Sequence, residues 1–171
     1  YEKTGISDLI NSEEGVLFAE IASLSDELTY RCLTISDGTN DNRIIIRYSN
    51  VSNVLQALCY TPAGLSGYTQ YTLTDETSFS KIAFKYKLND FALWIDGTEV
   101  GTSSGVVPTG LNTLDFASAS ATQYFFGKVK QLQIYKTALT DDELTILTGT
   151  SGVHFYPSYA AMASVLTYTI E

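Results

Sequence analysis

The chain of 171 residues carries a formal net charge of −9, and 44% of its residues are hydrophobic while only 17% are charged. This length can bury one substantial core. The basic residues are scattered, so the sequence lacks the positive cluster that nucleic acids and anionic membranes select, and no apolar run approaches the roughly 20 residues of a membrane-spanning helix. We therefore expect no nucleic-acid partner and no membrane insertion, and the absence of an initiator Met suggests a piece of a larger protein.

Short runs rich in Val, Ile, Phe, Tyr and Thr alternate with turn residues from Gly15 to Lys136, which is typical of a β-sandwich or barrel. Cys32 and Cys59 lie inside such runs and are predicted to be buried free thiols rather than a disulfide, which suits folding in a reducing cytosol. The predicted strands are roughly 15–24, 30–36, 43–49, 54–60, 68–73, 80–88, 91–96, 98–102, 112–117 and 125–136.

Two predicted strands have informative alternation. In the run 43–48, Arg43, Ile45 and Arg47 share one face, which we expect to be mostly exposed to solvent. The residues between them face the core. The segment 81–97 predicts a β-hairpin with a two-residue turn at Asn89 and Asp90. On its apolar side, that turn pairs Leu88 with Phe91, Tyr86 with Leu93 and Phe84 with Ile95, and the opposite side carries Lys85, Lys87, Ala92 and Trp94.

A change to helical spacing follows the last predicted strand. Thr140 and Glu143 are placed to form a capping box, which predicts a short helix over 138–147. Beyond a small linker, Ser158 would cap a second helical stretch, and the strand-like 167–170 ends the chain. We therefore expect a β-sandwich over 1–148 and a C-terminal appendage, a short helix plus an extended tail, over 149–171.

Two motifs, in the same order, carry a resemblance to a known family. The run 126–144 resembles the closing signature of laminin G-like domains, in which a last strand leads through "aromatic-Tyr-x-x-Ala-Leu-Ser/Thr-x-x-Glu" into a short helix. The run 91–100 is similar to that family's "Leu-Tyr-Val-Asp/Asn-Gly-x-x-Val", with Trp94 where Tyr is common. The runs 14–21, 36–43 and 89–93 resemble the variant found in bacteriophage virion proteins such as tail fibres, and the whole resemblance covers roughly residues 5–148.

The resemblance implies an all-β, antiparallel two-sheet jelly-roll sandwich of the concanavalin A-like kind. Such domains mostly bind glycans or proteins, sometimes with calcium. Fold alone does not fix function, so the residues must be weighed as well.

The residues argue against an enzyme. The one histidine, His154, lies in the appendage, and no nucleophile motif surrounds any Ser or Cys. Paired carboxylates such as those at 13–14, 26–27, 75–76 and 141–143 lie in turns or at the helix start rather than alternating along one strand. A polysaccharide-cleaving enzyme would require carboxylates distant in sequence to converge in a cleft.

Candidate ligand-binding residues remain. Trp94, with Lys85 and Lys87 beside it, is a candidate platform for stacking a sugar ring, although Trp94 could instead pack beneath a loop, the appendage or a neighbouring subunit. Tyr68 and Tyr71 are further stacking candidates, or edge packing residues. Asp37, Asn40 and Asp41 offer oxygen ligands for calcium, but tight turns require the same residue types, and this second interpretation is favoured.

These observations favour a non-enzymatic, lectin-like module of a phage structural protein that holds a cell-surface glycan or polysaccharide during host attachment. The alternative is a structural or oligomerisation module that contacts other virion subunits or further copies of itself, without glycan binding. Both interpretations place the protein on the virion surface after folding in the host cytoplasm, or otherwise outside the cell.

Overall fold

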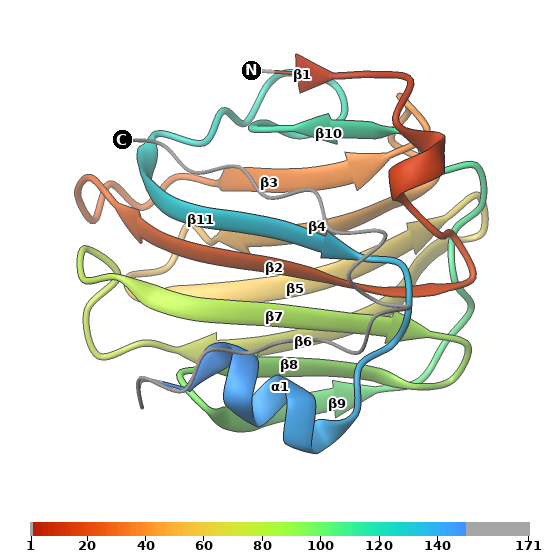
Figure 1. The fold of residues 1–171 in the computed structure, drawn as a ribbon. Coiled ribbons are helices and arrows are strands. Elements are labelled where there is room, and N and C mark those ends of the chain that lie inside the picture. Colours follow the sequence, from red (N-terminus) through yellow and green to blue (C-terminus); the bar gives the residue numbers. More distant parts are fainter. Residues whose placement is uncertain (1, 150–171) are drawn as a thin grey trace.

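The computed structural model describes residues 2–149, and these form two antiparallel sheets packed face to face (Figure 1). Sheet A has six strands in the order β1-β10-β3-β4-β5-β6, and sheet B has five in the order β11-β2-β7-β8-β9. The strands of sheet A are β1 (Glu2–Lys3), β10 (Thr113–Asp115), β3 (Arg31–Ser36), β4 (Arg43–Tyr48), β5 (Val54–Thr61) and β6 (Gly64–Thr72). Those of sheet B are β11 (Gly127–Tyr135), β2 (Glu14–Ser23), β7 (Ser80–Lys87), β8 (Phe91–Ile95) and β9 (Thr98–Ser103).

The main core lies between the inner faces of the two sheets. It consists of side chains at alternate positions of the strands, which point to the same face because successive strand residues point to opposite faces. Tyr86, Phe91 and Phe84 are its large aromatic members, and the Phe84 and Phe91 rings stack with centroids 6.0 Å apart. The jelly-roll sandwich predicted from the sequence is therefore confirmed.

The predicted strands agree closely with those in the structure, with two additions and one correction. The short strand β1 and the 3-10 helix η1 (Ser7–Leu9) were not predicted. The β7–β8 hairpin is predicted correctly as to faces but wrongly as to register, since Phe84 pairs with Leu93 rather than with Ile95. The turn lies one residue earlier than predicted, since the Asp90 amide donates to the Lys87 carbonyl oxygen at 2.9 Å and Asn89 has a left-handed φ of 59°. Leu88 is then a turn residue, 57% exposed, rather than a partner of Phe91.

One end of the sandwich is joined by a buried ion pair. Arg31 at the start of β3 contacts Glu76 of the β6–β7 connection at 2.8 Å, and each side chain is only 1% exposed. Arg31 also donates hydrogen bonds to the Ser23 hydroxyl and the Ser25 carbonyl oxygen after β2, and Glu76 accepts one from the Asn53 backbone amide. These contacts tie sheet A, sheet B and two connecting loops together.

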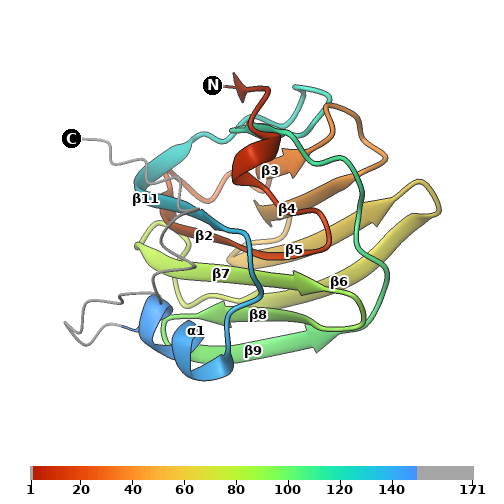
Figure 2. The ribbon, with the colours of Figure 1, turned by 45° about the vertical axis from the view of Figure 1, so that its right-hand side comes forward.

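The outer face of sheet B is covered at its β7–β9 end by α1 (Asp141–Thr148) (Figures 1 and 2). The predicted capping box is present, with the Glu143 amide donating to the Thr140 hydroxyl and the Thr140 amide to the Glu143 carboxylate. Leu144 and Leu147 of α1 complete a second, smaller apolar cluster with side chains of β2, β7 and β8. The predicted second helical stretch, the strand-like tail and His154 lie outside the described residues.

The thiols confirm another prediction. Both Cys32 and Cys59 are free and buried, and desolvation raises the pKa of Cys32 to about 11 and that of Cys59 to about 12. Over residues 2–149, no helix has the length and apolar character required to cross a membrane.

Candidate functional site

Trp94 faces away from the main core, as predicted, but it is not a solvent-exposed platform. The side chain is only 6% exposed and packs in the cluster beneath α1, against residues such as Phe18 and Leu147. The indole therefore offers no free face to a sugar ring. The physical reason is the helix, whose apolar side requires cover and finds it on the outer face of sheet B.

The two lysines beside Trp94 are committed to carboxylates. The Lys85 ammonium lies 2.9 Å from the Asp90 carboxylate and 3.7 Å from that of Asp141, while Lys87 lies 2.9 Å from Glu14. Their charges are largely balanced within the fold. The predicted site of Trp94, Lys85 and Lys87 is thus a packing arrangement, and it is corrected accordingly.

Tyr68 and Tyr71 are 39% and 41% exposed, but they lie on opposite sides of β6. The Tyr68 hydroxyl accepts a hydrogen bond from Gln56 Nε2 at 3.1 Å on the outer face of sheet A. Tyr71 instead points towards sheet B and lines a cavity at the edge of the sandwich. The structure therefore keeps both residues accessible without bringing them into one site.

The loop proposed for calcium is built as a hydrogen-bonded turn. Asp37 Oδ1 accepts from the Thr39 amide at 2.8 Å, Asp37 Oδ2 accepts from Asn42 Nδ2 at 2.9 Å, and Asn40 Oδ1 accepts from Arg43. Partial burial of Asp37 opposes its ionisation, but the hydrogen bonds from Thr39 and Asn42 outweigh that effect and lower its pKa. Asp41 is exposed, and residues 2–149 contain no group of three or more His, Cys, Asp or Glu residues that could hold a metal ion.

The outer face of sheet A carries a different constellation, which we call the arginine face and define as Arg43, Arg47 and their neighbours Tyr30, Gln56 and Tyr60. Strand register creates it, because Arg43 pairs with Tyr60 and Arg47 with Gln56 across β4 and β5. The Arg43 guanidinium carbon lies 4.3 Å from the Tyr60 ring centroid, and that of Arg47 lies 4.2 Å from the Tyr30 centroid. Both cations are therefore stacked on aromatic rings and held in place.

Hydrogen bonds orient the two guanidinium groups further. Arg47 Nε donates to Gln56 Oε1 at 2.8 Å, which leaves its two terminal nitrogens without a partner among the described residues. Arg43 donates through Nη1 to Asn40, while its Nε is buried and has no partner among those residues. Arg47 can thus present a planar pair of N–H donors, the geometry that suits a carboxylate.

A loop forms the wall of this face. Residues 118–123 come over β4 and enclose, with Arg43, Ile45 and Arg47, a cavity of about 200 Å³. The hydroxyls of Ser118, Ser120 and Thr122 hydrogen-bond to one another at 3.1–3.2 Å. The cavity therefore combines cationic donors, hydroxyl groups and one apolar side chain.

The charge of the arginine face contrasts with the rest of the protein. The chain has a net charge of −9, yet neither Arg43 nor Arg47 forms an ion pair with a carboxylate of residues 2–149. A positive site without internal neutralisation favours an anionic ligand. The sharing of one face by Arg43, Ile45 and Arg47 was predicted correctly, but that face is half-buried rather than mostly exposed to solvent. Its cover and its role as a site were missed, because the loop that walls it lies some 75 residues further along the chain.

Comparison with known proteins agrees with this architecture. Residues 22–145 match the family model described as the concanavalin A-like lectin/glucanases superfamily. The chain belongs to that superfamily. No curated protein sequence gives a significant match, so the superfamily membership rests on the family model, and the fold comparison below agrees with it.

Members of the concanavalin A-like fold among solved structures include carbohydrate-binding modules. The CBM40 module of a Ruminococcus gnavus IT-sialidase aligns with a TM-score of 0.68 at 17% identity, covering 87% of this chain and 98% of that one. The same module has been solved bound to α2,3 sialyllactose. Domain 4 of a Geobacillus stearothermophilus arabinanase, solved with arabinotriose, gives 0.65 at 15% identity over 82% of this chain and 68% of that one. Mouse laminin α1 domains LG4-5 give 0.56 at 9% identity over 81% and 40%. These TM-scores show a shared fold.

Proposed function

We propose that this domain is a non-enzymatic, lectin-like module that binds an acidic glycan through the arginine face. The single observation that carries the proposal is the pair of stacked, pre-oriented arginines that have no carboxylate partner within the described chain. A carboxylated sugar supplies the missing anion, and its hydroxyl groups match the hydroxyl-lined wall at 118–123.

Pre-organisation supports the proposal energetically. Arg47 is held by the Tyr30 ring and by Gln56 before any ligand arrives, so little side-chain entropy remains to be lost on binding. A hydrogen bond to a charged group contributes about 1.5–3 kcal/mol, which corresponds to roughly 10- to 100-fold in affinity. The fold is shared with a CBM40 module solved with bound α2,3 sialyllactose, which is compatible with such a ligand.

The non-enzymatic part of the proposal rests on the carboxylates. Asp75 and Asp96, which are distant in sequence, line one cavity at the sandwich edge, which makes them a carboxylate pair to weigh for glycosidase chemistry. Hydrogen bonds from the Thr77 side chain and amide and from Ser78 lower the pKa of Asp75, whereas a general acid requires a raised one. Asp75 is therefore unsuited to the role of general acid, which supports binding rather than hydrolysis as the proposed function.

The biological setting is a further part of the proposal. The runs that resemble phage virion proteins suggest a domain of a tail fibre-type protein on the virion surface, folded in the host cytoplasm and used in attachment. Many copies on one particle would raise the effective affinity by about 10²–10⁴ without any new contact. Contacts with other virion subunits belong to the same proposal.

An array of acidic and neutral glycans first shows which acidic glycans bind. Isothermal titration calorimetry with α2,3 sialyllactose then tests the site. We expect saturable binding that weakens with added salt, because the decisive contact is between charges near the surface. Arg47→Gln should weaken it about 10- to 100-fold. Lys128→Gln is the matched control, since it removes the same charge from an exposed position on β11 of sheet B.

Lactose provides the ligand control, because it lacks the carboxylated sugar and should not compete with sialyllactose at the arginine face. Absence of binding to every acidic glycan on the array would overturn the proposal and leave the structural or oligomerisation module as the function. Equal losses in Arg47→Gln and Lys128→Gln would show a general charge effect rather than a site.

A further inference from the structure

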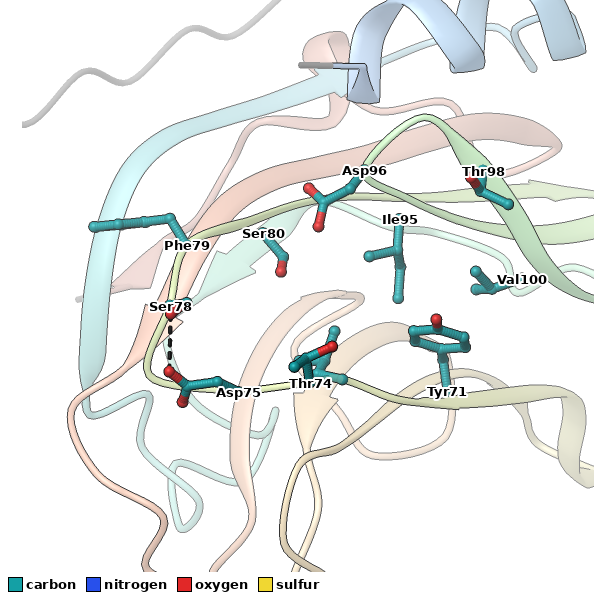
Figure 3. A pocket seen from close by; sticks show the side chains of 11 residues that line it. Tyr71, Thr74, Asp75, Ser78, Phe79, Ser80, Ile95, Asp96, Thr98 and Val100 are labelled. Atoms are coloured by element: carbon teal, nitrogen blue, oxygen red, sulfur yellow. Dashed lines mark hydrogen bonds between the residues drawn. The ribbon is translucent and has the colours of Figure 1, made fainter.

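A second cavity, of about 400 Å³, opens at the edge of the sandwich, on different elements from the arginine face (Figure 3). It lies where the β6–β7 connection crosses from sheet A to sheet B, beside the β8–β9 turn. Its interior continues the main core, because Leu73 and Ile95 belong to that core and Val100 packs against it. The inter-sheet space is therefore left uncapped at this position.

Ser80 is the most informative residue of this cavity. It occupies an inward-facing position of β7, in line with Ile82 and Phe84, where an apolar side chain would extend the core. It is only 7% exposed, and its hydroxyl has no hydrogen-bond partner among residues 2–149. Figure 3 shows this hydroxyl directed into the cavity. The hydroxyl oxygen is open to solvent in the cavity, so a sugar hydroxyl can replace water as its hydrogen-bond partner.

Two carboxylates contribute hydrogen-bond acceptors to the cavity. Asp96 Oδ1 accepts a hydrogen bond from the Lys81 amide at 2.9 Å, which fixes the side chain and leaves Oδ2 without a partner in the described chain. Asp75 is oriented by Thr77 and by Ser78, whose hydroxyl donates to Asp75 Oδ2 at 2.8 Å. Neither carboxylate forms an ion pair with a cation of residues 2–149, so the cavity repels anions.

An aromatic ring completes the cavity. Tyr71 lies across from Ile95 and Val100 in Figure 3 and is 41% exposed. The cavity thus presents a ring face and an apolar floor together with fixed carboxylates. A sugar has apolar C–H faces that stack on such a ring and hydroxyls that donate to carboxylates, whereas a metal ion would need more ligands than residues 2–149 bring together.

We infer that this edge cavity is a second saccharide site, specific for a neutral sugar, with Tyr71 as the stacking residue and Asp96 and Ser80 as the groups that bind hydroxyls. It goes beyond the proposed function, because it rests on other residues and selects against the charge that the arginine face selects for. A domain with both sites can engage an acidic and a neutral sugar of one glycan or of two.

Amide chemical-shift perturbation on the whole chain tests this inference, with arabinotriose and lactose as separate neutral probes at millimolar concentration. We expect shifts at residues 75, 80 and 96 with at least one probe. Tyr71→Ala should weaken binding about tenfold or more, and Tyr71→Phe should retain most of it because the ring is kept. Asp96→Asn keeps the acceptor for the Lys81 amide and should weaken binding by a smaller factor.

Arg47→Gln separates this site from the arginine face, because it should leave the edge-cavity shifts with lactose and arabinotriose unchanged while weakening sialyllactose binding at the arginine face about 10- to 100-fold. The inference is overturned if neither sugar probe shifts the cavity amides, or if folded Tyr71→Ala binds a sugar probe as tightly as the parent chain. It is also overturned if methylammonium shifts the cavity amides and the sugars do not. Failure of every acidic glycan on the array to bind would overturn the proposed function and leave this inference standing.

Discussion

Breaking the buried ion pair between Arg31 and Glu76 is expected to be the costliest single polar change in the described chain. Each side chain is 1% exposed and the two lie 2.8 Å apart, so neither can recover hydration if its partner is removed. Removal of one partner of such a pair typically costs about 3–5 kcal/mol. For a chain of this size that corresponds to a fall of roughly 6–20 °C in the melting temperature.

Glu76→Gln is the informative variant, because an amide oxygen can still accept from the Asn53 backbone amide while the charge is lost. Urea unfolding of Glu76→Gln, Arg31→Met and the double variant gives the coupling free energy of the pair. We expect the double variant to lose clearly less stability than the sum of the single ones. The exposed pair of Lys130 and Glu20 is the control, where Lys130→Gln should cost under about 1 kcal/mol. Additive losses in the double variant would refute the reasoning.

Two further predictions concern other buried groups. Desolvation, and then the opposed Glu2 carboxylate, raise the pKa of Asp115 from 3.8 to about 6. The folded state thus favours the neutral acid, so the free energy of unfolding should fall as the pH rises from about 3.8 to about 6 and level off above. Asp115→Asn should remove that fall and stabilise the protein at pH 7 by roughly 1–2 kcal/mol. Identical urea midpoints across this pH range would contradict the prediction. Trp94→Ala should lower the free energy of unfolding by about 3–5 kcal/mol while leaving the glycan affinity of the folded protein unchanged in a calorimetric titration. Lost affinity in a folded variant would instead place Trp94 in the binding site.

The strands and their faces could be predicted from the sequence because alternation is a local property. Arg43, Ile45 and Arg47 were assigned to one face, and the structure places them there. The turn was harder, because Asn89 can take either of its two central positions. Its displacement by one residue shifts the register by two residues without changing the faces. The prediction therefore gave the correct faces with the wrong partners.

The candidate site depended on contacts between distant parts of the chain, which alternation does not report. Trp94 does face outward from its sheet, but the helix that covers it begins at Asp141, and nothing around Trp94 signals that cover. Lys85 is likewise bound by Asp141. Conversely, Tyr71 and Asp96 come together only because β6 and the β8–β9 turn lie at the same edge of the sandwich. An aromatic residue and a carboxylate far apart in sequence give no joint signal before the fold is known.

The position of α1 gives the outer faces of the two sheets different roles. Because α1 packs against the outer face of sheet B, the residues there contribute to stability. Substitutions among them are constrained by the cluster of Leu144, Leu147 and Trp94. The arginine face lies on the far side of a sandwich whose sheets are about 10 Å apart, and it shares no residue with that cluster. Residues on the arginine face are therefore free to diversify, and one scaffold can change its ligand many times without first having to be restabilised.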